Sequence, residues 1–171
     1  MIPFCLVLGD STAVGTADAL AAQGMRCAVH AREGAPSIET VKTWHSGSVS
    51  DRALVALGSN DALNPNLASN LQLLRRRVTA NQVTWLAPYH PRAAAIVAAI
   101  AEQFGDTVVQ LGRFSSNDGI HPKSYRAVAT ALRWQTPAPL PYRYATSRSS
   151  PPSAARSASV IRQAVVMTFQ Q

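Results

Sequence analysis

The chain alternates short runs of apolar residues with longer segments whose apolar positions recur at helical spacing. A short apolar run bounded by turn residues is typical of a buried strand, and the longer period is typical of an amphipathic helix. The predicted strands cover residues 4–8, 26–31, 52–57, 82–86 and 107–111. The predicted helices cover residues 12–23, 37–44, 67–78, 91–104 and 122–134.

Regular alternation of strands and helices predicts a parallel sheet that helices cover on both faces. Right-handed crossovers then make the fold a three-layer α/β/α sandwich with a five-stranded, doubly wound sheet. Ligands of such folds bind beyond the carboxyl ends of the strands. Polar residues that directly follow a strand are therefore the first candidates for a functional site.

Several residues are expected to set the helix boundaries. Gly24 is a suitable stop for the first helix, Ser37 is expected to cap the second, and Pro122 is expected to open the last. The run of arginines at residues 75–77 lies at the predicted end of the third helix. Cations there interact favourably with the helix dipole, so we interpret the run as structural rather than as a binding patch.

Composition supports one domain followed by an extension. The chain has 171 residues, of which 47% are hydrophobic and 15% charged, as in a globular protein with room for one core. Residues 1–135 form the predicted domain. From residue 136 the chain is rich in Pro, Ser and Arg, and residues 136–171 hold four arginines and no acid. We interpret this part as a flexible, basic extension that is either solvated or contacts nucleic acid, acidic lipid or an acidic polymer.

The two cysteines and the N-terminus bear on the compartment. Cys5 and Cys27 both fall in apolar stretches, which favours buried free thiols over a bridge and agrees with a reducing compartment. Neither a signal peptide nor a transmembrane segment is predicted, so we expect a cytoplasmic protein without membrane insertion. A trimmed N-terminus would give the same pattern, and an exported protein remains the alternative.

The first candidate site residue is Ser11, in the sequence Gly9-Asp10-Ser11 after the first strand. A serine at this place lies where backbone N–H groups and the positive end of a helix converge, which suits a nucleophile whose reaction forms an oxyanion. The alternative is that Ser11 only caps the helix. Gly34, after the second strand, would let a backbone N–H approach a ligand, although by itself it is an ordinary loop glycine.

Two further blocks follow the third and fifth strands. In Gly58-Ser59-Asn60-Asp61 the Asn60 amide can donate a hydrogen bond to an oxyanion, or it can simply form a turn. In Asp118-Gly119-Ile120-His121 the spacing lets the Asp118 carboxylate orient the imidazole while its other nitrogen takes a proton. A capped helix start would explain Asp118 but would leave His121 without a role.

With these four blocks, residues 4 to about 134 resemble the SGNH (GDSL-type) hydrolase superfamily. The resemblance implies a flavodoxin-like strand order of 2-1-3-4-5, with Ser11 as nucleophile, His121 as base and Asp118 as its partner. It also implies an oxyanion hole made by the Ser11 and Gly34 backbone amides and the Asn60 side chain. No cofactor and no metal are expected.

The function that we expect from this resemblance is that of a serine esterase that removes short acyl groups, above all acetyl, with carbohydrate O-acetyl groups as the leading substrate. The net charge of +7 would favour an acidic glycan over a neutral one. Topology alone suggests substrate-binding roles for Ala35, Asn64, Tyr89 and His90. The alternatives are an O-acetyltransferase, a nucleotide-binding flavodoxin-like module and a non-catalytic adaptor that uses the basic extension. No specific nucleic-acid partner is expected, and the oligomeric state is open.

Overall fold

The computed structural model describes residues 4–45 and 49–135. One sheet contains the strands β1 (Cys5–Gly9), β2 (Ala28–Ala31), β3 (Ser50–Ala56), β4 (Ala80–Ala87) and β5 (Thr107–Gln110). Their order is β2-β1-β3-β4-β5, and each neighbouring pair is parallel. The predicted five-stranded parallel sheet and its strand order are confirmed.

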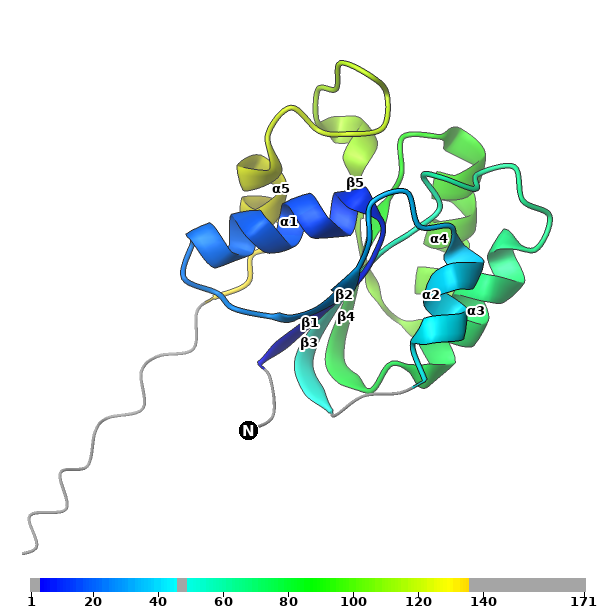
Figure 1. Ribbon diagram of the computed structural model, residues 1–171, viewed down its shortest axis with the longest axis horizontal. Coiled ribbons are helices and arrows are strands. Elements are labelled where there is room, and N and C mark those ends of the chain that lie inside the picture. The colour runs from blue at the N-terminus through cyan, green and yellow to red at the C-terminus, as the bar shows by residue number, and fades with distance from the viewer. Residues whose placement is uncertain (1–3, 46–48, 136–171) are drawn as a thin grey trace, which may run out of the picture. The chain divides into compact units, whose positions relative to one another are not determined.

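Helices cover both faces of the sheet, as Figure 1 shows. The helices are α1 (Ser11–Ala22), α2 (Ser37–Thr43), α3 (Leu67–Arg77), α4 (Pro91–Phe104) and α5 (Tyr125–Ala131), with a short 3₁₀ turn η1 (Leu111–Arg113) after β5. Helices α1 and α5 lie on one face and α2, α3 and α4 on the other. Because all strands run in the same direction, the loops that follow them meet at one edge of the sheet.

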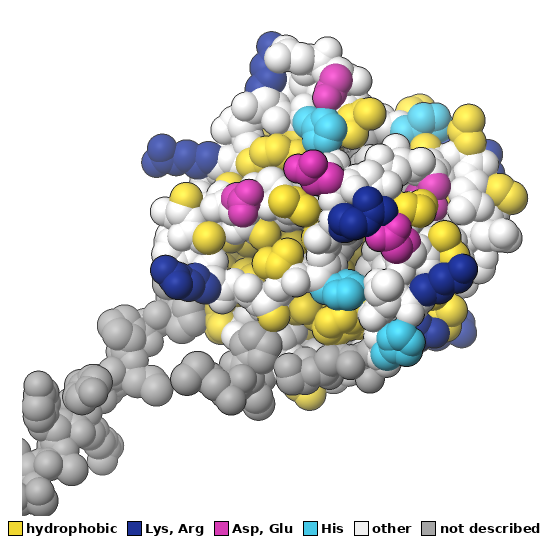
Figure 2. Space-filling model, in the orientation of Figure 1, with side chains coloured by type: hydrophobic (Ala, Val, Ile, Leu, Met, Phe, Trp, Pro, Cys, Tyr) yellow, Lys and Arg dark blue, Asp and Glu magenta, His cyan; other side chains and the backbone are white. Residues whose placement is uncertain are grey.

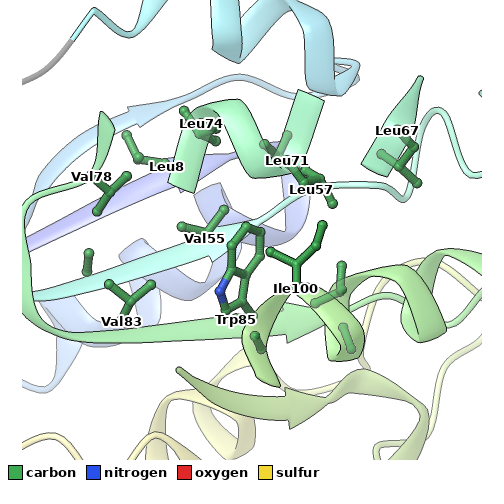
Figure 3. Packing of buried hydrophobic residues seen from close by; sticks show 14 of the residues in the cluster. Leu8, Val55, Leu57, Leu67, Leu71, Leu74, Val78, Val83, Trp85 and Ile100 are labelled. Carbon is green, nitrogen blue, oxygen red and sulfur yellow. The ribbon is translucent and has the colours of Figure 1, made fainter. Parts of the chain in front are cut away.

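Alternate residues of the inner strands build two cores. Leu8 and Val55 point to the face covered by α3 and α4, where they pack with Trp85 and other buried side chains (Figure 3). Val7 and Leu54 belong to the opposite core, beneath α1 and α5. This alternation follows from the two-residue period of a strand. Burial of each such side chain stabilises the fold by roughly 2 kcal/mol.

The structure corrects one predicted helix start and one predicted helix cap. Helix α5 begins at Tyr125 and is capped by Ser124, whereas Pro122 forms an isolated bridge with Ser116 in the preceding loop. Ser37 does not cap α2 with its side chain. Instead its backbone N–H donates to Asp61 Oδ2 at 3.0 Å, so the cap comes from a loop that is distant in sequence. A contact of this kind leaves no mark in the local sequence.

The arginine run at the end of α3 makes structural contacts. The Arg75 guanidinium donates from Nε to Asp106 Oδ2 at 2.6 Å and from Nη2 to Oδ1 at 2.8 Å. Arg77 Nη1 donates to the backbone oxygens of Val41 and Trp44. These bonds hold the end of α3 against neighbouring segments, in agreement with the structural interpretation of the run.

Cys5 and Cys27 form a disulfide, so the prediction of two free thiols is wrong. The register of β1 and β2 pairs Leu6 with Ala28. It therefore places Cys5 opposite Cys27, the residue just before β2. Their Cα atoms lie 4.6 Å apart, within bonding range of two cysteine side chains. The apolar surroundings of each cysteine were read correctly, but the pairing depends on strand register.

Residues 136–171, for which we predict the basic extension, lie outside the described residues. Among the described residues, every helix is too short or too polar to cross a lipid bilayer.

Candidate active site

Ser11 is the first residue of α1 and follows β1 after a sharp change of direction at Gly9 and Asp10. Gly9 has a φ of 146°, and a Cβ there would lie 1.9 Å from the backbone oxygen of Ala56 in β3. Only glycine permits this close approach. Asp10 is the N-cap of α1, with Oδ1 accepting from the Thr12 N–H at 2.9 Å. The cap role therefore belongs to Asp10, and the Ser11 hydroxyl is free for another partner.

That partner is His121. Ser11 Oγ and His121 Nε2 lie 2.9 Å apart, and His121 Nδ1 lies 2.7 Å from Asp118 Oδ2. Asp118 Oδ1 also accepts from the backbone N–H groups of Ile120 and His121 at 2.9 and 2.8 Å. The turn thus folds around the carboxylate, which fixes the position of the imidazole.

The same bonds determine the charge of Asp118. The backbone hydrogen bond from His121 is the largest cause that lowers the Asp118 pKa well below its usual range, followed by the bond to the imidazole. Asp118 is accordingly ionised at any pH near neutrality. An ionised acceptor at Nδ1 directs the imidazole proton to that nitrogen and leaves Nε2 able to accept the serine proton.

Ser116, which sequence reasoning missed, organises this turn. Its hydroxyl donates to the backbone oxygen of His121 at 2.6 Å and accepts from the Gly119 N–H at 2.9 Å. The signal in the sequence was a serine directly before an Asn-Asp-Gly turn, where hydroxyl groups often bond to nearby backbone atoms.

Gly34 and Asn60 are held next to each other by contacts between their loops. Gly34 has a φ of 72°, in the left-handed region that favours glycine. Asn60 Nδ2 donates to the backbone oxygen of Ala35 at 3.3 Å. A primary amide carries two N–H donors, so the second remains for a ligand. Ser11 opens α1, and its N–H therefore has no partner within the helix.

The structure brings Ser11, Gly34, Asn60 and His121 together at one pocket of about 470 Å³, with Asp118 behind the imidazole. The pocket lies at the edge where the loops after β1, β2, β3 and β5 meet. Figure 2 shows this face, where acidic side chains flank a histidine in the upper half of the view. The remaining lining residues are Val14, Gly15, Asp18, Glu33 and Tyr125.

None of the four residues suggested for substrate binding lines this pocket. Ala35 is buried and faces a separate hollow between β2 and α2. Asn64 donates to Asp61 and accepts from the backbone of Asn66, so it shapes its own turn. Tyr89 and His90 line a neighbouring hollow of about 380 Å³.

The pocket residues that sequence reasoning missed come mainly from α1. Val14, Gly15 and Asp18 follow Ser11 at helical spacing and therefore share its face of the helix. That spacing was a usable signal once Ser11 was placed at the helix start. Glu33 adjoins Gly34, and Tyr125 is the first residue of α5, but nothing local marked either residue as part of a pocket.

Beneath the nucleophile lies a buried acid, Asp10, with 0% of its surface exposed. One oxygen accepts from the backbone and the hydroxyl of Thr12, at 2.9 and 2.7 Å. The other oxygen, Oδ2, is buried as well, and the backbone and side chain of Ser59 join Thr12 in hydrogen bonding to the carboxylate. Burial raises the pKa of Asp10, while its hydrogen bonds act in the opposite direction.

Among the described residues no group of three or more His, Cys, Asp or Glu side chains is placed to hold a metal ion.

Comparisons with known proteins bear on the fold. The structure is similar to the C-terminal catalytic domain of Streptococcus pneumoniae peptidoglycan O-acetyltransferase A (OatA), solved with a methylsulfonyl adduct. The TM-score is 0.54 and the identity 15%, over 78% of this chain and 94% of that one. It is also similar to the native M. smegmatis aryl esterase, with a TM-score of 0.52 and 16% identity, over 75% of this chain and 95% of that one. Comparisons with protein-family models and with curated protein sequences give no match. The chain therefore shares the fold of these two proteins.

Proposed function

We propose that the protein is a serine esterase that hydrolyses short-chain esters, acetyl esters above all, with Ser11, His121 and Asp118 as its catalytic triad. The observation that carries the proposal is the chain of two short contacts from Ser11 Oγ through His121 to Asp118, at 2.9 and 2.7 Å. Gly34 and Asn60 line the same pocket and supply the oxyanion donors together with the Ser11 amide. The shared fold with an aryl esterase and an O-acetyltransferase domain supports chemistry on acyl esters.

The reaction proceeds in two halves. Ser11 Oγ bonds to the ester carbonyl carbon while His121 Nε2 takes the hydroxyl proton, and Asp118 stabilises the imidazolium. The oxyanion meets the Ser11 and Gly34 amides and the Asn60 amide, each worth about 3 kcal/mol in the barrier. The ester C–O bond then breaks, and His121 gives its proton to the leaving alcohol. Water attacks the acyl-enzyme by the same steps and releases the acid and free Ser11.

The test is hydrolysis of p-nitrophenyl acetate by the wild type and by Ser11→Ala, with circular dichroism to verify folding. We expect the variant to lose at least about a thousandfold in kcat/KM, because the residual rate rests on binding and oxyanion stabilisation alone. The matched control is Ser69→Ala, at an exposed serine of α3, which should keep the wild-type rate. Equal activity of the wild type and a folded Ser11→Ala would disprove the proposal.

The second candidate is acetyl transfer to a sugar hydroxyl. The specific observation in its favour is the similarity to the catalytic domain of a peptidoglycan O-acetyltransferase. The two activities share the acyl-enzyme and differ in whether water or an alcohol resolves it. Acetylated sugar formed from p-nitrophenyl acetate and added oligosaccharide, at a rate that competes with release of acetate, would favour the transferase.

The nucleotide-binding alternative has less support. Asp18 and Glu33 line the pocket, and their carboxylates would repel a phosphate group. The adaptor alternative relies on residues 136–171, which lie outside the described part of the chain, and it gives the Ser11–His121–Asp118 contacts no task.

We infer that the protein acts in oxidising surroundings, which was the alternative to a cytoplasmic location. Disulfides persist outside the reducing cytosol, and here both cysteines of the chain are paired. An O-acetylated glycan of a cell surface fits such surroundings as a substrate.

A further inference from the structure

The charges that line the catalytic pocket are opposite in sign to those of the whole chain. The chain has 16 Lys and Arg against 9 Asp and Glu. Its pocket is lined by the acids Asp18 and Glu33 and by no Lys or Arg among the described residues. The expectation that net charge favours an acidic glycan therefore finds no support at the point where substrate would bind.

Neither carboxylate forms a close ion pair with a described residue, and Arg26, the cation beside Asp18, lines a separate hollow with it. Asp18 and Glu33 belong to none of the ion pairs formed among the residues the structure describes. Arg32 is next to Glu33 in the sequence, but its Nε and Nη2 donate to Glu39 of α2. Its Nη1 donates to the Glu33 backbone oxygen at 2.7 Å rather than to the carboxylate. The two carboxylates in the pocket therefore remain available to attract a cationic group.

Tyr125 adds an aromatic wall to this pocket, and Gly15 makes room for it. A Cβ at position 15 would lie 2.5 Å from Cε2 and Cζ of the Tyr125 ring, so any larger residue would displace the ring from α1. Burial is the main cause that raises the pKa of Tyr125 to about 12, with added contributions from Asp10 and Asp118. The phenol is therefore neutral at physiological pH, and its ring can attract an ammonium group.

The pocket extends along α1 from the nucleophile, because one face of this helix carries Ser11, Gly15 and Asp18. At the usual rise per residue, the Asp18 Cα lies roughly 10 Å along the axis from that of Ser11. Helical side chains lean towards the N-terminus, which brings the carboxylate closer to the nucleophile. An ester held at Ser11 can thus extend its alcohol part past the Tyr125 ring towards the two acids.

We propose that the pocket selects esters whose alcohol part carries a positive charge, with Asp18 and Glu33 attracting an ammonium group and the Tyr125 ring contacting it. This inference rests on the proposed esterase function and names the class of substrate.

The experiment compares charged and neutral esters of the same shape. Acetylcholine is paired with 3,3-dimethylbutyl acetate, and 6-(trimethylammonio)hexyl acetate with 7,7-dimethyloctyl acetate, so that each pair differs only in N⁺ against C. Quaternary ammonium is used because a primary amine could take the acetyl group from its own ester. Release of acetic acid is followed by titration at constant pH. In at least one pair, we expect the kcat/KM of the charged ester to exceed that of its neutral partner about tenfold or more.

Variants assign the preference to its residues. Asp18→Asn combined with Glu33→Gln should lower the charged-to-neutral ratio at least about threefold, and salt should lower the wild-type ratio. Tyr125→Phe keeps the ring and should keep the ratio, whereas Tyr125→Leu should reduce it. The matched control is Glu102→Gln, an exposed acid of α4 outside the pocket, which should leave the ratio unchanged. A ratio taken within one enzyme cancels any general loss of activity.

The outcomes separate this inference from the proposed function. A charged-to-neutral ratio near or below one in both pairs, from an enzyme that hydrolyses p-nitrophenyl acetate through Ser11, would overturn the inference and leave the esterase standing. A high ratio that survives the double variant would also overturn it, because the selectivity would then come from elsewhere. Absence of Ser11-dependent hydrolysis of p-nitrophenyl acetate would instead refute the esterase itself.

Discussion

Asp10, next to the nucleophile, is both the cap of α1 and a buried acid. Its Oδ1 caps α1 through the Thr12 N–H, and this cap frees the Ser11 hydroxyl to contact His121. The carboxyl group is fully buried, and hydrogen bonds from Thr12 and Ser59 partly offset the cost of burying it. The fold thus tolerates a buried acid in order to end β1 and start α1 within two residues.

The buried Asp10 makes the stability of the protein depend on pH. Burial raises the Asp10 pKa above the usual aspartate value of 3.8, so the folded state favours the protonated acid. The wild type therefore loses stability as pH rises from 3.8 towards the folded-state pKa, because the unfolded chain ionises more readily. Asp10→Asn removes this dependence and can still accept from Thr12. We expect the free energy of unfolding of the variant, relative to wild type, to increase between about pH 4 and pH 7.

Urea unfolding of both proteins at these two pH values measures the effect. A difference in unfolding free energy that is the same at both values would show that the Asp10 charge costs the fold nothing.

Among the elements, α3, β4 and the start of β5 are joined by one buried ionic contact. Asp106 accepts two hydrogen bonds from Arg75 and a third from Trp85 Nε1 at 2.9 Å. Only 4% of the Asp106 side chain is exposed, against 16% for Arg75. The Arg75 guanidinium also lies 5.0 Å from the centre of the Phe104 ring. One carboxylate therefore connects α3 to β4 and to the start of β5.

We expect Asp106→Ala to lower the free energy of unfolding by about 3 kcal/mol, because it leaves a largely buried guanidinium without its partner. The matched control is Asp51→Ala, which breaks the Arg52–Asp51 pair, where Asp51 is 45% exposed and the contact is 3.5 Å. That change should cost about 1 kcal/mol or less. Denaturant titrations compare the two variants, and similar losses would contradict the role assigned to Asp106.

At the scale of the whole molecule, the disulfide links the start of the edge strand β2 to its neighbour β1. The bond joins Cys5 of β1 to Cys27 just before β2, at a sequence separation of 22. The loop it closes contains the whole of α1, and therefore the residue at which the proposed chemistry begins. A cross-link of this span restricts the unfolded chain and so favours the folded one.

We expect reduction of the bond, or the double change Cys5→Ala and Cys27→Ala, to lower the free energy of unfolding by about 3 kcal/mol. Thermal unfolding with and without reductant measures the loss, and reductant should have no effect on the double variant. Two thiols that react in the unfolded, unreduced protein would show that the bond is absent.

The sequence by itself determined the layers of the fold and indicated that Ser11, Gly34, Asn60 and His121 lie at one edge of the sheet. Apolar runs and helical spacing report which elements form, and a parallel sheet brings the residues after its strands to one edge. Ser11, Gly34, Asn60 and His121 could therefore be assigned to one pocket from their places after strands. Local patterns are sufficient where the role of a residue depends only on the helix or strand it follows and on its position at the end of that element.

Only the tertiary structure decided which side chains meet across elements. The disulfide required the register of β1 against β2, the cap of α2 required Asp61 from another loop, and the ring of Tyr125 required Gly15 on a helix far away in sequence. The acidic lining of the pocket likewise runs against the net charge of the chain. Contacts between distant segments depend on packing geometry, which composition and periodicity do not encode.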